Sequence, residues 1–112
     1  PGGAFWSVTV HSTEDAPEDL VDTVVATMRA MYDDLDSEDT EEEILGREVI
    51  GSDLNFYCLD LTNSAEVRVF ESKRGNFVIL CQADDREFDE VRRVFQAMTF
   101  SLLQESSWLK LP

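Results

Sequence analysis

The segment that decides the fold spans residues 42–83 and has the sequence EEILGREVIGSDLNFYCLDLTNSAEVRVFESKRGNFVILCQA. It contains four runs rich in aliphatic, β-branched or aromatic residues, and short polar stretches separate these runs. The runs predict strands at residues 42–50, 54–61, 66–71 and 76–83. The polar stretches predict turns at residues 51–53, 62–64 and 73–75. Connections this short require antiparallel neighbours, so the segment predicts a four-stranded antiparallel meander.

Two of these strands carry apolar side chains at consecutive positions. Residues 56–59 are FYCL, and residues 77–81 are FVILC. Because successive side chains of a strand point to opposite faces of the sheet, such runs are typical of a sheet that is covered on both faces. We therefore expect a helix on each side of the sheet.

Amphipathic helices are predicted before and after the sheet. The first follows Asp15, a candidate N-cap with Glu18 three residues later and Pro17 in the first turn. The second follows Asp84, which has Glu87 at the same spacing. Apolar residues recur every three or four positions in both helices. They are Leu20, Val21, Val24, Val25, Met28, Met31, Tyr32 and Leu35 in the first, and Phe88, Val91, Val94, Phe95, Met98 and Leu102 in the second.

A further strand is predicted at residues 5–10, where Trp6, Val8 and Val10 fall on one face. The element order is then β-α-β-β-β-β-α. We predict the α/β (α+β) class, as a three-layer α/β/α sandwich with an antiparallel meander sheet.

The 112 residues fit a single domain, 1–112, or an excised fragment of a longer chain, since the sequence begins with Pro1. Residues 104–112 lack periodicity and are expected to form a C-terminal tail, from which Trp108, Leu109 and Leu111 pack back onto the body.

The net charge of −15 is concentrated in the first half of the chain. Residues 1–56 hold 15 acids against Arg29 and Arg47, whereas residues 57–112 hold nine acids against seven bases. Nucleic-acid affinity depends on lysine and arginine, so we expect no nucleic-acid partner.

No apolar run approaches the roughly 20 residues that span a bilayer, and no signal-peptide pattern opens the sequence. We expect no membrane insertion, and a cytoplasmic location unless a leader has been removed.

The element order, and particularly residues 42–60 (EEILGREVIGSDLNFYCLD), resembles the PsbP-like family, which includes small bacterial domains of unknown function. The matching features, over residues 17–103, are a helix, an acidic segment, a strand with Gly46 after Ile44, a meander, and a closing helix with Phe95 and Ser101. The resemblance implies an α/β sandwich and an assembly or interaction role. Family members usually open with a pair of strands and a Pro-x-x-Trp type motif, whereas only Pro1 and Trp6 occur here.

One run of the sequence is exceptionally acidic, with eight acids in eleven positions. These are Asp33, Asp34, Asp36, Glu38, Asp39, Glu41, Glu42 and Glu43. Clustered carboxylates suit Ca²⁺, but a calcium loop starting at Asp34 would have Asp39 in place of glycine and Leu45 in place of the final glutamate. The other interpretations are a mobile solvated loop, a docking surface for a basic partner, and acidity that serves solubility alone.

Few other residues suggest chemistry. His11 lies near Ser12 and Asp15, but a linker does not preorganise a catalytic triad. Cys58 and Cys81 lie in predicted strands and are expected to be buried free thiols, which suit a reducing compartment. The sequence shows neither metal-ligand spacing nor a phosphate loop, so we predict no enzymatic activity, no cofactor and no metal.

Two groups of charged residues are expected to form structural ion pairs. Arg47, Arg68 and Glu48 would pair across strands. Arg92 and Arg93 would lie on the exposed side of the last helix and pair with Glu87, Asp89 and Glu90.

The sequence favours a non-enzymatic protein interaction or assembly module whose acidic surface binds a basic protein. The alternative is a small-molecule carrier with an apolar cleft between the sheet and the first helix, lined by Met28, Met31, Tyr32 and Phe56. The same residues also fit an ordinary core. The sequence predicts neither the partner nor the oligomeric state.

Overall fold

The computed structural model describes residues 4–108, with backbone alone for residues 106–108. Its elements are β1 (Phe5–His11), α1 (Pro17–Met31), β2 (Asp36–Ile44), β3 (Arg47–Cys58), β4 (Leu61–Ser72), β5 (Gly75–Asp84) and α2 (Asp85–Trp108). The predicted order of strands and helices is confirmed. Among the described residues, no helix is both long and apolar enough to span a membrane.

The five strands form one antiparallel sheet in the order β1-β5-β4-β3-β2. The segment from β2 to β5 is the predicted meander, in which each strand pairs with the next along the chain. β1 pairs with β5, from Phe5 opposite Gln82 to His11 opposite Asn76. β1 and β2 are therefore the edge strands, and the fold is α+β with two helices.

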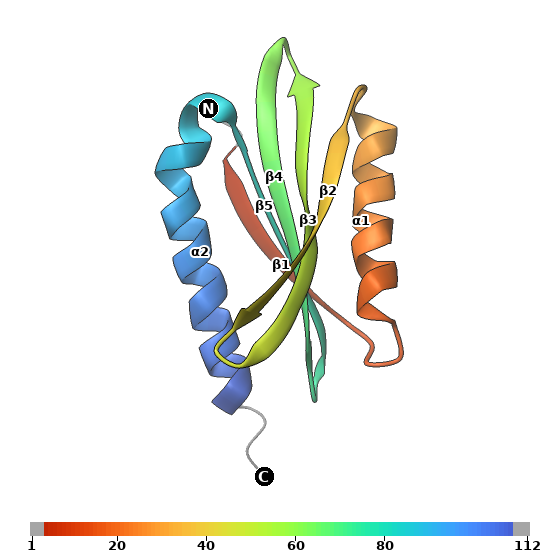
Figure 1. Ribbon diagram of the computed structural model, residues 1–112, viewed down its shortest axis with the longest axis vertical. Helices are drawn as coiled ribbons and strands as arrows, with labels where there is room; N and C mark the ends of the chain where they lie inside the picture. Colours follow the sequence, from red (N-terminus) through yellow and green to blue (C-terminus); the bar gives the residue numbers. More distant parts are fainter. Residues whose placement is uncertain (1–3, 109–112) are drawn as a thin grey trace.

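The core lies against both faces of the sheet. Figure 1 shows α1 on one side of the sheet and α2 on the other. Against α2, Phe70 and Ile79 pack in one cluster with Phe95 and Leu103. Against α1, two further clusters form, Met28 with Leu54, Phe56 and Ala65, and Val21 with Val67, Val69 and Val78.

Two of the three predicted turns are wrong. Residues 51–53 lie inside β3, and residues 62–64 lie inside β4. The chain turns instead at Leu45–Gly46 and Leu59–Asp60, where the four φ angles are between 54° and 73°. Two consecutive residues with positive φ match the two-residue type I′ turn, which follows the twist of a hairpin. The third turn is correct, since Lys73 and Arg74 connect Ser72 to Gly75.

Gly51 has a packing role instead of a turn role. It lies opposite Arg68 in the pairing of β3 with β4. A Cβ atom at Gly51 would overlap the Val67 carbonyl oxygen and lie 3.0 Å from Arg68 Cδ. The absence of a side chain therefore lets the Arg68 side chain cross the surface of β3.

Both ends of α1 differ from the prediction, whereas the start of α2 agrees with it. α1 ends at Met31, four residues before the expected end, and Met31 is exposed. Ala16 takes the N-cap position of α1, without a side-chain cap, where Asp15 was expected. Asp84 does cap α2, because its Oδ1 accepts a hydrogen bond from the Arg86 backbone N–H.

The predicted C-terminal tail is wrong over residues 104–108, where α2 continues. The expected packing of Trp108, Leu109 and Leu111 lies outside the described side chains.

The prediction of two-sided burial holds for residues 77–81 of β5, which are buried or half-buried. It fails for residues 56–59, because Tyr57 is 60% exposed and Leu59 is 91% exposed.

Candidate functional site

The acidic run forms an edge strand, which corrects the prediction of a mobile loop. Asp33 and Asp34 lie in the turn after α1, and the other six acids lie on β2. The backbone of β2 pairs with β3 from Asp36 opposite Asn55 to Ile44 opposite Arg47. Because neighbouring strand residues point to opposite faces, adjacent carboxylates are directed apart and their repulsion is reduced.

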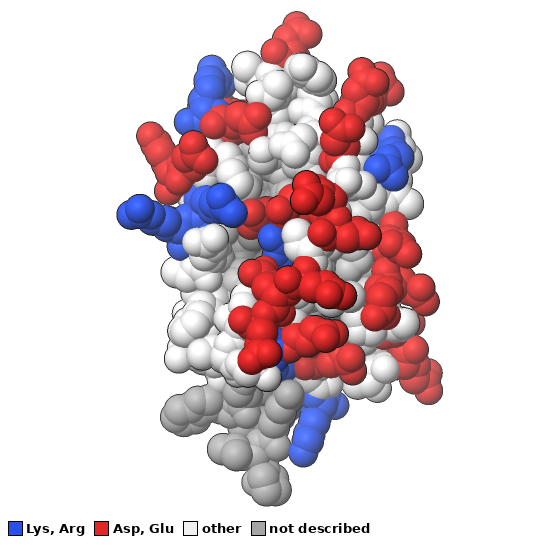
Figure 2. Space-filling model, in the orientation of Figure 1, with Lys and Arg blue, Asp and Glu red and all other residues white. Residues whose placement is uncertain are grey.

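Further acids extend this surface towards α1. A hollow of about 150 Å³ is lined by Asp39 and Glu41 of β2, Glu18 and Asp22 of α1, and Glu48 of β3. We define the acidic edge as the six acids of β2 together with Glu18, Asp22 and Glu48. Figure 2 shows acidic side chains gathered over the region of β2 and α1. This extension was not predicted from the sequence, although Glu18 and Asp22, four residues apart, share one face of a helix.

The acidic edge lacks the geometry of a metal site in the part of the chain that the structure describes. No three histidine, cysteine or acidic residues there are placed to hold a metal ion. The ion pairs seen within residues 4–105 use Arg68, Arg86 and Arg92, and none of them involves an acid on the α1 side of β2. The acids on the α1 side of β2 thus form no ion pair among the described residues.

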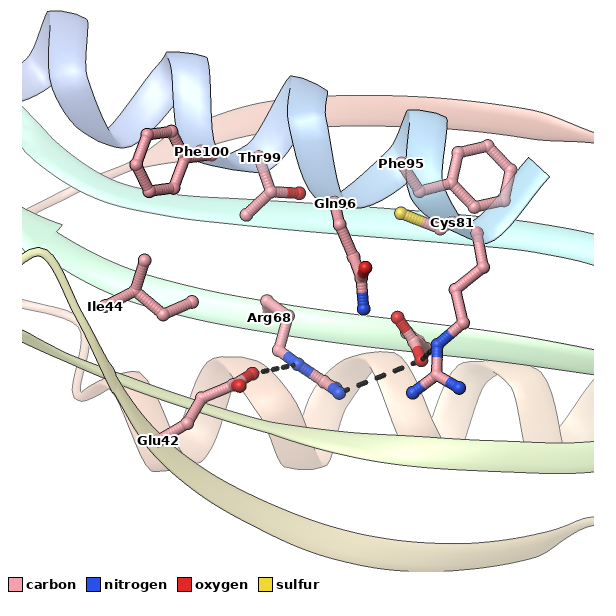
Figure 3. Close-up of a pocket in the computed structure, with 10 residues that line it drawn as sticks. Glu42, Ile44, Arg68, Cys81, Phe95, Gln96, Thr99 and Phe100 are labelled. Carbon is pink, nitrogen blue, oxygen red and sulfur yellow. Dashed lines mark hydrogen bonds and ion pairs between the residues drawn. The ribbon is translucent and has the colours of Figure 1, made fainter. Parts of the chain in front are cut away.

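A cavity of about 280 Å³ lies between α2 and the sheet. Figure 3 shows that Ile44 and Phe100 lie at one end and that Arg68 and Gln96 lie towards the other. α2 supplies Phe100 and Gln96, β2 supplies Ile44 and β4 supplies Arg68. The cavity therefore has an apolar end and a charged end.

Arg68 is the centre of the charged end and is 13% exposed. Its Nε donates to Glu42 Oε1 at 2.9 Å, its Nη2 donates to Asp53 Oδ1 at 2.8 Å, and its Nη1 donates to the Val67 carbonyl at 2.9 Å. Burial alone would lower the pKa of Arg68, but the hydrogen bonds and charges of its acidic neighbours raise it above the usual value. Arg68 is therefore a permanent cation with its hydrogen-bonding capacity largely used.

Glu66 has weaker partners than Arg68 and is 12% exposed. Its Oε2 lies 3.6 Å from Arg92 Nε and 4.0 Å from Arg68 Nη2, and neither contact is a hydrogen bond. Burial raises the pKa of Glu66, Arg68 and Arg92 oppose the rise, and Asp53 and Glu42 add to it. Glu66 is thus a largely buried carboxylate that lines a cavity and lacks a close donor among the described residues.

Cys81 also lines the cavity, and its thiol is not activated. Burial, together with the charge of Glu66, raises its pKa to about 12. A thiol with such a pKa is not a nucleophile near neutral pH. Cys81 is buried and free as predicted, whereas Cys58 is free but only half-buried.

Of the remaining candidate residues, Arg47 and Arg92 have partners other than the predicted ones. The His11 ring Nε2 lies 2.9 Å from Thr9 Oγ1, and no contact with a carboxylate is seen for it among the described residues. Arg47 donates to the carbonyls of Leu103 and Glu71 and lies over the Phe70 ring, instead of pairing with Glu48. Arg92 reaches across to Glu66 of β4 instead of pairing within α2.

Replacing Glu66 by glutamine is expected to change the pH dependence of stability. A raised carboxyl pKa in the folded state stabilises the fold at pH values below the ordinary value of 4.5, and this contribution is lost as the pH rises through the raised pKa. Glu66→Gln removes that loss. The melting temperature of the variant minus that of the parent should therefore be larger at pH 7 than at pH 4. Thermal denaturation at both pH values measures the difference.

Asp84→Asn is the control with the opposite sign. The Arg86 side chain, through its hydrogen bond, lowers the pKa of Asp84. Ionised Asp84 stabilises the fold above the ordinary pKa of the group, and this stabilisation is lost as the pH falls. Asp84→Asn should therefore lower the melting temperature more at pH 7 than at pH 4. If Glu66→Gln shows the same pH dependence as Asp84→Asn, burial is not the dominant influence on the pKa of Glu66.

Comparison with known proteins shows the fold alone. No family model matches the chain, and no curated protein matches it. Among solved structures, the chain is similar to PA94, a protein of unknown function from Pseudomonas aeruginosa that has been suggested to be a regulator. The TM-score is 0.65 at 11% sequence identity, over 87% of this chain and 69% of PA94. A likeness at this identity supports a common fold and carries no function.

Proposed function

We propose that this domain is a non-enzymatic protein interaction module whose acidic edge binds an extended basic segment of a partner protein. The observation that carries the proposal is the place of the acidic run, which forms an edge strand of the sheet. β2 pairs with β3 on one side, so its other side is open to a further strand within the described part of the molecule. Main-chain pairing at β2 would give affinity, and basic side chains opposite the carboxylates would give specificity.

The architecture proposed for the module is a three-layer α/β/α sandwich of the PsbP-like kind. The separate clusters against α1 and α2 support the three layers. The interaction role is what the resemblance to the PsbP-like family implies. In this arrangement the helices cover the faces of the sheet and leave the β2 edge for the partner.

The proposed attraction is electrostatic and long-range. Carboxylates gathered on one edge raise the rate of encounter with a cationic segment. Salt shortens the range of this field to about 10 Å at 0.1 M ionic strength. The affinity of a basic segment should therefore fall steeply as salt is added.

A basic heptapeptide of alternating lysine and valine tests the proposal. We expect it to shift the backbone amide NMR signals of β2, with an affinity that falls about tenfold between low and physiological salt. Glu41→Gln with Glu43→Gln should weaken binding several-fold more than Asp89→Asn with Glu90→Gln, which removes the same charge from α2. A peptide with the same lysines but interrupted by prolines should bind more weakly, because proline cannot donate to a strand.

Three results would contradict the edge-strand proposal. The two double variants could weaken binding equally, the proline peptide could bind as well as the strand peptide, or the shifted amides could lie away from β2. The second result would mean that the acidic edge attracts cations without a defined docking mode. The first and third would mean that the peptide does not bind at the acidic edge.

A carrier cleft between α1 and the sheet receives less support. Tyr32 stacks on Phe56 with ring centroids 4.2 Å apart, and Met28 is buried in the same cluster. Met31, the remaining candidate lining residue, is exposed. A small-molecule site is better supported by the cavity on the α2 side of the sheet.

A further inference from the structure

We propose that the cavity between α2 and the sheet binds a small primary amine with an apolar group, the ammonium on Glu66 and the apolar group against Ile44 and Phe100. The cavity holds about 280 Å³, just below the range of roughly 300–1,000 Å³ that is typical of small-molecule sites. It therefore suits a compact ligand. The cavity shares Glu42 and Ile44 with β2, but it lies on the α2 side of the sheet and takes a small molecule instead of a peptide strand.

The carboxylate of Glu66 supplies the recognition of the ammonium group. It is largely buried, lines the cavity, and has no donor within hydrogen-bond distance among the described residues. Its ion pairs with Arg92 and Arg68 are too long for hydrogen bonds, so a ligand donor would supply the hydrogen bond that the carboxylate lacks among the described residues. A charged donor gives the stronger bond, because hydrogen bonds between ions are roughly twice as strong as neutral ones.

The charge balance of the site favours a cation over an anion. Three carboxylates, Glu42, Asp53 and Glu66, surround the guanidinium groups of Arg68 and Arg92. The donors of Arg68 are already directed at carboxylates and a carbonyl, so they are not available to an anionic ligand. Arg92 is half exposed and paired with Glu66, which leaves it a weak anchor for an anion.

The apolar end of the cavity supplies the rest of the contact. Ile44 and Phe100 lie together at that end, away from Arg68 (Figure 3). Phe100 is 43% exposed, so a ligand that covers its ring removes apolar surface from water. Gln96 lies towards the charged end and adds a neutral acceptor for a second ammonium proton.

The binding should require ionised Glu66. The groups that face Glu66 are Arg68 of β4, Arg92 of α2, Asp53 of β3, Glu42 of β2 and Cys81 of β5. The Cys81 thiol stays neutral below its pKa of about 12, and an alkylamine stays charged below a pKa of about 10. Amine affinity should therefore rise as the pH rises from 4 to 7, while Glu66 loses its proton.

The test compares three phenyl ligands of similar size at pH 7: phenethylamine, 2-phenylethanol and 3-phenylpropanoate. NMR titration of the full chain should give saturable shifts of cavity residues with phenethylamine, with a Kd on the order of 1 mM for so small a ligand. Glu66→Gln should weaken phenethylamine binding about tenfold. Glu90→Gln removes the same charge from the exposed side of α2 and should weaken it less than about twofold.

A second variant separates the two ends of the cavity. Phe100→Ala should weaken phenethylamine and 2-phenylethanol to the same extent, whereas Glu66→Gln should affect the amine alone. The proposal is overturned if phenethylamine shows no saturable shifts at tens of millimolar, or if 3-phenylpropanoate binds as tightly. It is also overturned if Glu66→Gln and Glu90→Gln have equal effects. Melting curves of each variant confirm that it is folded.

Discussion

Phe70→Ala is expected to lower the free energy of unfolding by about 3–5 kcal/mol, the range for large-to-small changes at buried aromatic residues. Phe70 is 1% exposed and belongs to the cluster beneath α2. Its ring stacks on Phe77 with centroids 5.1 Å apart, and the Arg47 guanidinium lies 4.8 Å from its centroid. The substitution leaves a cavity that close-packed neighbours fill only in part. Urea denaturation followed by circular dichroism measures the loss.

Tyr57→Ala is the matched control for Phe70→Ala. Tyr57 is also an aromatic strand residue, but its side chain is mainly exposed. Its removal should cost less than about 1 kcal/mol, as at most surface positions. Equal losses for the two variants would contradict the assignment of Phe70 to the core.

Gly51→Ala is expected to lower the free energy of unfolding by about 2–3 kcal/mol, the upper range for overpacking in a filled site. The added Cβ would overlap the Val67 carbonyl oxygen and crowd Arg68 Cδ. A backbone atom cannot move aside as a flexible side chain can, so β3 and β4 must separate locally. The hydrogen bonds of Arg68 to Glu42 and Asp53 should weaken together with that pairing. Thermal and urea denaturation measure the effect.

Gly46→Ala is the control for Gly51→Ala. Gly46 has a φ of 73°, and a Cβ there would meet nothing within 4 Å. Its cost is therefore the strain of a left-handed residue, about 1 kcal/mol. A larger loss at Gly46 than at Gly51 would show that turn conformation matters more than the close approach of β3 and β4.

Much of the fold could be predicted from hydrophobic pattern and connection length. The order of elements, the antiparallel meander and the turn at Lys73–Arg74 all follow from the sequence. The Asp84 cap was also predictable, because the acid directly precedes an amphipathic pattern. These features depend on neighbours along the chain, which the sequence displays directly.

The two other hairpin turns could not be predicted from turn-forming residues. Leu45 and Leu59 adopt left-handed φ angles, which cost energy for a residue with a Cβ. Gly51, Ser52 and Asp53 are better turn formers, yet they lie inside β3. Pairing along a 12-residue strand outweighs the local cost at each leucine, and Gly51 is required by the close approach of the Val67 carbonyl and the Arg68 side chain. Tertiary contacts thus override the local signal at both places.

The acidic strand was missed for a similar reason. β-Propensity is low for aspartate and glutamate, and their repulsion suggested a loop. The β-propensity of residues on an exposed strand face depends strongly on context, and β2 pairs with β3 along its whole length. Edge strands often carry charged side chains, so an acidic run next to a strong hairpin is a usable signal for an edge.

The cavity was also missed, although one signal for it was present. In β4, Ala65, Val67 and Val69 are buried against α1, while Glu66 and Arg68 occupy the opposite face. Charged residues in an otherwise covered strand indicate a polar site beneath the covering helix. The partners of these residues, Glu42 and Arg92, come from distant parts of the chain and depend on the strand order.

The contrast between the two ends of the sheet bears on self-association. A second copy laid along β2 would set carboxylates against carboxylates, and like charges directly opposite each other destabilise a strand pair. β1 has no ionisable residue between Phe5 and Val10, so it has no such protection. At neutral pH the carboxylates therefore disfavour the pairing of two copies through β2.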